Sequence, residues 1–371
     1  MATLLRPDTA PQRIDTTPQP MPALSSKPIE GSRYWSHDFM AREWEGIWTK
    51  SWLIGGLAAQ VAKPGDFFTY DIGRESILVT HGDDGQIRAF YNVCPHRGKR
   101  LVMEEEGHSK RIACSYHGWR FTHEGELNFV PCPEDFAGGT PCGKVKLEEV
   151  RCEVFASFVW VNLDPQAKPL AHHLGPVAHQ IEGYRMEQMH RTHWVTLEGD
   201  WNWKCVQDNF NESYHLPFVH PQTRFVMEQS YKDCQFDLYA PEGHARMFMP
   251  GSRPARSLRG HTDTVLEMMA QELTYWGLDP EDFRDDPLRT REALQQAKRE
   301  RGADKGYDFS HFHDAQLTDH FHYTIFPNIS FSLKPDGCIW LRADPHPTDP
   351  ERCYFDMWYF TWFPEGKDRY Y

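Results

Sequence analysis

The sequence predicts an α+β protein, with a small antiparallel β domain followed by a domain in which helices cover an antiparallel sheet. Two observations carry this prediction. Between about residues 51 and 164, short runs rich in β-branched and aromatic residues alternate with turn residues, as in an antiparallel sheet. After about residue 169, strand-like runs are combined with longer polar helical segments, which is the pattern of an α+β domain. A chain of 371 residues is also long enough for two domains.

The elements are expected in the following order. The N-terminus is proline-rich and lacks an apolar stretch, which is typical of a disordered leader. Met40, Trp44, Ile47 and Trp48 then recur at helical spacing, so a short amphipathic helix should begin near His37. The predicted parts are a leader at 1–27, a helical segment at 28–50, the β domain at 51–165 and the larger domain at 166–371.

Within the β domain, Asp83-Asp84-Gly85 lies between two apolar runs and predicts a hairpin. In the larger domain, the best helical patterns lie at 264–276 and 288–301. The last strand candidates of that domain are 320–333, 337–345 and 353–363.

Composition excludes several classes of function. The formal net charge of −13 argues against a nucleic-acid partner, because a duplex repels an acidic surface. No run approaches 18 consecutive apolar residues, so no membrane span is expected. The nine cysteines follow no disulfide framework, and we expect reduced thiols, metal ligation and a cytoplasmic protein.

Two short loops of the β domain carry metal-ligand residues. Cys94 and His96 stand in the first loop, and Cys114 and His117 in the second, each with a glycine that permits a tight turn. The order Cys, His, Cys, His lets each loop give one ligand to each of two irons, as a [2Fe–2S] centre with two thiolates and two imidazoles requires. Zinc is the alternative, although zinc fingers usually give both cysteines first.

A second dense cluster lies between Asn202 and Pro221. If this segment is one helix, Asp208, Glu212 and His215 share a face, because they are spaced i, i+4 and i+7. Pro217 would end the helix and let His220 return beside His215. Two imidazoles and a carboxylate form the facial triad of non-haem ferrous oxygenases, so His215 and His220 are the candidate metal ligands, with Glu212 and Asp208 as candidate catalytic carboxylates.

At this point the chain, over roughly residues 30 to 363, resembles the catalytic α subunit of Rieske-type, ring-hydroxylating oxygenases. The resemblance implies a Rieske [2Fe–2S] cluster on Cys94, His96, Cys114 and His117, and a mononuclear Fe(II) on His215 and His220. It also implies that Glu212 bridges the iron histidine of one subunit to the Rieske histidine of its neighbour, with His117 as the contact. The expected assembly is therefore a homotrimer.

The same resemblance implies the reaction and its partners. Electrons from NADH would arrive through a separate ferredoxin or flavin reductase, since the chain has no glycine-rich dinucleotide motif. Dioxygen would then be used to hydroxylate a small organic, aromatic substrate. A member of another class, a Rieske protein that only transfers electrons, would leave the second cluster of residues unexplained.

The sequence departs from the family pattern in two places. Aromatic-ring dioxygenases of this family usually carry an aspartate at the bridge, with one more residue between it and the preceding asparagine. Here Asn209 and Glu212 are three residues apart, and a glutamate at this spacing is similar to the carnitine and glycine-betaine monooxygenase branch, which cleaves or demethylates quaternary amines. The family's third iron ligand is a carboxylate on a helix after the last strands. Asp336, Asp344 and Asp356 instead lie in or beside predicted strands, so we expect none of them to join the histidines and the chain to lack that ligand.

Overall fold

A computed structural model describes residues 17–20, 22–239 and 241–363 of the chain. The described residues fall into two compact units. The first consists of residues 30–173 and 344–351, and the second of the described residues in 8–29, 174–343 and 352–371. Most of the predicted leader lies outside the described residues. Within the second unit, the Gln19 backbone N–H donates to Asp237 Oδ1 at 2.8 Å.

The first unit is built on an antiparallel sheet of seven strands in the order β1-β10-β9-β4-β3-β2-β5, with a second, three-stranded sheet β6-β7-β8. Its strands are β1 Leu53–Leu57, β2 Asp66–Ile72, β3 Glu75–His81, β4 Ile87–Tyr91, β5 Glu106–His108, β6 Ile112–Ala113, β7 Arg120–Phe121, β8 Leu127–Phe129, β9 Glu149–Phe155 and β10 Phe158–Asn162. The Asp-Asp-Gly turn joins β3 to β4 as predicted, and β1 and β10 are buried along their whole length.

The helices of the first unit lie before the sheet in the chain or between and after its strands. They are α1 Ser32–Trp35, α2 His37–Glu43, the π-helix η1 Trp44–Trp48, the 3₁₀ turns η2 Ala58–Val61 and η3 Pro133–Asp135, and α3 Leu170–Leu174 at the boundary of the unit. The predicted amphipathic helix therefore exists, although its second half is wound as a π-helix. The Ser36 side chain accepts from the Phe39 N–H at the start of α2, which is an N-cap contact.

The second unit contains a seven-stranded sheet in the order β11-β17-β16-β15-β14-β13-β12. Its strands are β11 His190–Gly199, β12 Gln235–Tyr239, β13 His244–Met249, β14 His320–Ile325, β15 Ile329–Lys334, β16 Gly337–Pro345 and β17 Cys353–Thr361. The single strand expected at 320–333 is in fact the hairpin β14–β15, whose residues pair from Phe321 with Leu333 to Ile325 with Ile329. Both faces of β14 are buried from Phe321 to Ile325.

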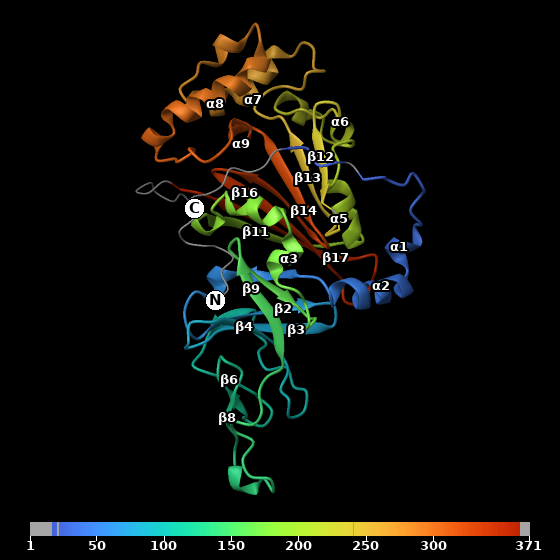
Figure 1. Cartoon of the computed structure of the whole chain (residues 1–371), viewed down its shortest axis with the longest axis vertical. Helices are drawn as coiled ribbons and strands as arrows, with labels where there is room; N and C mark the ends of the chain where they lie inside the picture. Colours follow the sequence, from blue (N-terminus) through green and yellow to red (C-terminus); the bar gives the residue numbers. More distant parts are fainter. Residues whose placement is uncertain (1–16, 21, 240, 364–371) are drawn as a thin grey trace. The chain divides into compact units, whose positions relative to one another are not determined.

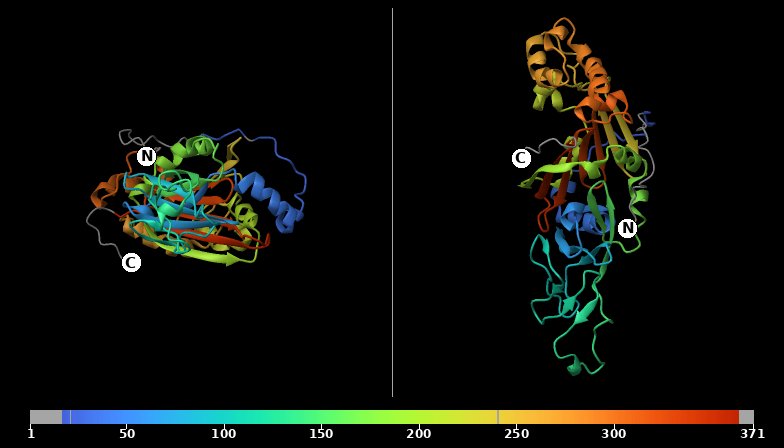
Figure 2. Two further views of the ribbon diagram at one scale, coloured as in Figure 1. Left: turned by 90° about the horizontal axis from the view of Figure 1, so that it is seen from below. Right: turned by 90° about the vertical axis from the view of Figure 1, so that its left-hand side faces the viewer.

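Helices of the second unit cover the sheet and extend beyond it. They are α4 Val177–Glu182, η4 Met186–Gln188, α5 Trp203–Phe210, α6 Leu216–Val219, η5 Pro221–Phe225, α7 Thr262–Tyr275, η6 Pro280–Phe283, η7 Pro287–Arg289, α8 Thr290–Arg301, η8 Ala303–Lys305 and α9 Asp314–Thr318. The short helix α5 packs on β15 and β17. The two long helices α7 and α8 match the predicted helices and gather beyond the α9 end of the sheet (Figures 1 and 2). No helix in the described part of the chain combines the length and apolar character needed to cross a bilayer.

Candidate iron–sulfur and mononuclear iron sites

Two loops of the first unit have the same backbone geometry. In the first loop the Cys94 N–H donates to the Lys99 carbonyl at 2.8 Å, and the Gly98 N–H donates back to the Cys94 carbonyl at 2.9 Å. In the second loop Cys114, Trp119 and Gly118 repeat this pattern at 2.8 and 3.0 Å. Both glycines have positive φ, +69° and +71°, which only glycine adopts without strain. The sequence therefore builds one ligand-bearing turn twice.

The four predicted ligands of these loops form two pairs. Cys94 and Cys114 are 1% and 3% exposed within the apolar core of the domain, and their thiols are close enough to hydrogen-bond. The imidazole rings of His96 and His117 lie toward the surface with their centroids 4.6 Å apart. The Trp119 ring stacks on His96 at 4.7 Å and orients it.

The electrostatics of the pairs suit a metal cluster. Burial, with the neighbouring Cys114 thiol, raises the pKa of Cys94, so two adjacent thiolates require a bound cation to persist there. Burial and the nearby His117 lower the pKa of His96, which favours the neutral imidazole that binds metal.

The arrangement of the cysteines and histidines as two pairs bears on the choice between a zinc site and a [2Fe–2S] cluster. Zinc needs all four ligands around one point. Among the residues that the structure describes, no three His, Cys, Asp or Glu side chains converge in that way. A cysteine pair and a separate histidine pair fit a [2Fe–2S] cluster, which takes thiolates on one iron and imidazoles on the other.

The backbone around the second cluster differs from the helix expected there. Helix α5 starts at the Asn202 cap, whose side chain accepts from the Lys204 N–H, and it ends at Phe210. Glu212 and His215 therefore lie in the turn beyond the helix. The prediction that they share a helical face with Asp208 was wrong. Pro217 does not end a helix either, because it stands in the first turn of α6.

This turn nevertheless brings the two candidate iron ligands together. The rings of His215 and His220 lie with their centroids 5.5 Å apart and at 76° to each other. Glu212 accepts from the backbone N–H of His215 at 3.0 Å and contacts Nδ1 of the same imidazole, and it also accepts from the Tyr214 N–H. A carboxylate on Nδ1 leaves Nε2 of His215 for a metal. Asp208 is exposed on α5.

The three aspartates considered as a third ligand are placed elsewhere. Asp356 is buried and accepts from Arg342 Nε at 3.1 Å and from Trp194 Nε1 at 3.1 Å. Asp344 accepts from the Tyr70 hydroxyl at 3.1 Å. Asp336 lies in the turn between β15 and β16. Within residues 17–363 as described, none of the three joins a metal-binding group with the histidines.

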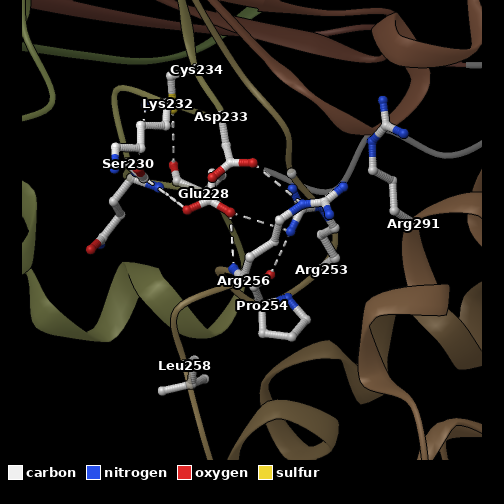
Figure 3. A network of polar contacts seen from close by, with 12 residues as sticks. Glu228, Ser230, Lys232, Asp233, Cys234, Arg253, Pro254, Arg256, Leu258 and Arg291 are labelled. Carbon is white, nitrogen blue, oxygen red and sulfur yellow. Dashed lines mark hydrogen bonds and ion pairs between the residues drawn. The ribbon is translucent and has the colours of Figure 1, made fainter.

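Sequence reasoning missed Glu228 and Gln229, which hold in place the histidine loop, that is, the segment 215–229 that contains His215 and His220. The Glu228 carboxylate accepts from the Arg256 N–H at 2.9 Å and pairs with Arg253 at 3.4 Å, and both side chains of this ion pair are buried (Figure 3). Gln229 donates to the Thr223 hydroxyl, which in turn donates to the His220 carbonyl at 2.8 Å. No ligand motif marks these residues, because they act through the backbone after the second histidine.

Two family models match the chain. Residues 51–151 match the Rieske [2Fe-2S] domain, and residues 186–365 match the ring hydroxylating alpha subunit (catalytic domain). The chain belongs to the Rieske non-haem iron oxygenase family. The two models coincide with the two predicted cofactor regions, a Rieske [2Fe–2S] centre and a catalytic domain of a type that binds mononuclear iron.

Curated relatives of this Rieske oxygenase chain come from both branches considered above. The large oxygenase component of naphthalene 1,2-dioxygenase of Pseudomonas putida is 36% identical over 191 residues, which cover 49% of this chain and 42% of the relative. The carnitine monooxygenase oxygenase subunit of Escherichia coli is 33% identical over 194 residues, 51% of this chain and 50% of the relative. The chain thus spans about half the length of the curated relatives that it matches.

Solved structures share the fold of the Rieske oxygenase chain over most of its length. The quaternary ammonium Rieske monooxygenase CntA in complex with an inhibitor matches with a TM-score of 0.66 at 19% identity, covering 91% of this chain and 76% of the other. Naphthalene 1,2-dioxygenase with indole bound matches with a TM-score of 0.61 at 24% identity, covering 87% and 68%. At these identities the likeness establishes the fold, and it does not distinguish the two substrates.

Proposed function

We propose that this chain is the terminal oxygenase component of a Rieske system, which takes up electrons at its β domain and activates dioxygen at its catalytic domain. The single observation that carries the proposal is the presence of both ligand arrangements in one chain. The first unit has paired cysteines and paired histidines, and the second has His215 and His220 with Glu212 on the first of them. A protein that only relays electrons has no use for the second arrangement.

In this proposal Cys94, His96, Cys114 and His117 hold the cluster, and His215 and His220 hold the iron. A bound [2Fe–2S] cluster supplies one-electron transfer, and a bound ferrous ion supplies dioxygen chemistry. The protein buries the cysteines and leaves the histidines near the surface, so electrons have a short path through the imidazoles. The third, anionic iron ligand is proposed to come from outside the described residues.

Glu212 is the proposed bridge between subunits of a homotrimer. One of its carboxylate oxygens contacts His215, and the side chain remains partly exposed, so a neighbouring copy can reach it. Beside it, Tyr214 and Phe218 are 86% and 84% exposed, which is unusual for large apolar side chains. A second copy that docks its Rieske loops there would cover these rings. Asp208, exposed one turn earlier on α5, is the other carboxylate proposed to serve this path.

The electron donor is proposed to be a ferredoxin or a flavin reductase that draws on NADH, with the cytoplasm as the compartment. Nine free cysteines suit a reducing compartment. Neither nucleic acid nor a membrane has a role in this proposal.

The substrate is proposed to be a small aromatic compound that becomes hydroxylated. A quaternary amine such as carnitine or glycine betaine is the second candidate, and one observation favours it specifically. Glu212, rather than an aspartate at longer spacing, contacts the candidate iron ligand His215. The carnitine and glycine betaine monooxygenase subunits are among the relatives, as is the naphthalene dioxygenase component.

Product analysis with ¹⁸O-labelled dioxygen tests this function. Naphthalene, carnitine and glycine betaine should be offered to the chain with a ferredoxin, its reductase and NADH. We expect labelled oxygen in the product of one substrate class, and three irons per chain where the site is complete. Two irons per chain and no labelled product from any substrate, with the cluster reducible, would show a simple electron-transfer protein instead.

A further inference from the structure

A polar strip crosses the face of the sheet on which α5 packs. His322 of β14 lies opposite Ser332 of β15, and Thr324 lies opposite Ser330. The strip is internally bonded, since His322 Nδ1 lies 2.9 Å from Ser332 Oγ and Ser330 Oγ donates to Gln207 of α5 at 3.2 Å. A sheet face under a helix is normally apolar, so a row of polar side chains there indicates a functional role.

One atom of this strip lacks a partner. His322 is 5% exposed, and its Nε2 has no hydrogen-bond partner among the described residues. Burial lowers the pKa of His322 to about 4, so the ring is neutral at physiological pH. An unsatisfied buried polar atom costs about 1–3 kcal/mol, which a ligand that bonds to it would recover.

His322 lines a small hollow whose other lining residues include the end of α5, just before the turn that carries His215. The hollow has a volume of about 20 Å³, room for one water-sized group, and Phe210, Asn211 and His322 line it. The Phe210 ring stacks on His322 at 5.8 Å. Asn211 immediately precedes Glu212, and Leu216, which follows His215, packs on the cluster that contains Met247, the strand partner of His322.

We propose that His322 is a specificity-determining residue whose Nε2 binds one hydroxyl group of the substrate in the small hollow that His322 lines. This inference rests on the proposed oxygenase function and narrows its substrate class. The substrate is an organic compound with a neutral hydroxyl substituent, positioned so that the hydroxyl lies in the hollow and the remainder extends toward His215 and His220.

The chemistry of the subsite selects a hydroxyl over other groups. Depending on the tautomer that Ser332 stabilises, Nε2 is a donor or an acceptor, and a hydroxyl satisfies either case because it can do both. A carboxylate is excluded by charge and size. The nearest cation, Arg246, is paired with Asp237 at 2.8 Å in a fully buried ion pair, and the neutral ring cannot offset the cost of burying a second anion.

Two pairs of ligands that differ by one hydroxyl test the proposal, namely naphthalene against 1-naphthol and γ-butyrobetaine against L-carnitine. Dissociation constants should be measured by calorimetry on the full chain with its cluster. A site built to bond a hydroxyl discriminates strongly against the analogue that lacks it. We expect the hydroxylated member of at least one pair to bind about 10- to 100-fold more tightly, as one buried hydrogen bond allows.

Three variants complete the test. His322→Leu should reduce the preference to about twofold or less, and His322→Gln, whose amide nitrogen replaces Nε2, should retain part of it. His179→Leu, a matched change of an exposed histidine, should leave the preference unchanged. A preference that survives in His322→Leu, or its absence from the wild-type chain, would overturn the inference alone. Failure of all four compounds to bind the wild-type chain would overturn the proposed substrate classes as well.

Discussion

At the residue scale, Glu212 is the side chain that holds the turn with the candidate iron ligand His215. Its carboxylate accepts from two backbone N–H groups and contacts His215 Nδ1, so it organises the turn and the imidazole together. Both metal histidines keep their own side chains if only this group changes. Under the proposed function, a change at Glu212 therefore tests electron delivery separately from binding of the metal.

Glu212→Gln should retain most of the iron but slow electron delivery. The amide leaves one acceptor oxygen where the carboxylate offers two, so either the turn or the His215 contact weakens. Changes of this kind typically cost about 10- to 100-fold in activity or metal affinity. Single-turnover kinetics and iron analysis measure both effects, with Glu267→Gln on the exposed side of α7 as the control. Rapid single-turnover oxidation of the cluster in Glu212→Gln would show that electrons do not pass this carboxylate.

At the scale of elements, the sequence predicts periodic segments well and interrupted ones poorly. Helices α7 and α8 begin and end within two residues of their predicted bounds, because their apolar residues recur at helical spacing. The β14–β15 hairpin was read as one strand, since both of its strands are rich in aromatic and β-branched residues and only a short turn separates them.

The end of α5 illustrates why the turn with the candidate iron ligands could not be placed correctly from the sequence. No glycine or proline lies between Phe210 and His215, so the helical pattern continues in the sequence through His215. The helix stops because Glu212 bonds to backbone N–H groups that a continuing helix would use itself. The candidate ligands His215 and His220 were chosen from their residue types and spacing, and the structure brings their rings together. The turn that does so depends on the Glu212 side-chain contact, which no spacing rule shows.

The histidine loop is tied to the segment before α7 by the buried pair of Glu228 and Arg253. Glu228→Ala should lower the free energy of unfolding by about 3–5 kcal/mol, because it leaves a buried guanidinium without its counterion. Chemical denaturation monitored by tryptophan fluorescence measures this loss. Glu281→Ala removes an exposed partner of Arg284 and should leave the unfolding free energy near the wild-type value. Equal stability of the two variants would show that the Glu228 pair is not required.

At the scale of the whole molecule, the two candidate sites lie in different units of one chain, and the proposed homotrimer connects a Rieske domain to the catalytic domain of a neighbour. Each active site in such a ring needs an intact Rieske domain from one copy and an intact catalytic domain from its neighbour. Electron transfer between copies can be tested because the cluster site and the iron site can be inactivated in separate variants.

Co-expressed chains carrying His117→Ala and His215→Ala should recover activity that neither variant has alone. The first variant loses a predicted cluster ligand but keeps its catalytic domain, and the second loses a predicted iron ligand but keeps its Rieske domain. In a mixed ring, an intact Rieske domain of one chain can stand beside an intact catalytic domain of the other. Product formation by mixed assemblies, purified through different tags on the two chains, measures this recovery. A double variant, with both changes in one chain, co-expressed with itself provides the inactive control. Assemblies that contain both tags and form no product would mean that electrons stay within one chain, and the proposed role of Glu212 between subunits would then be wrong.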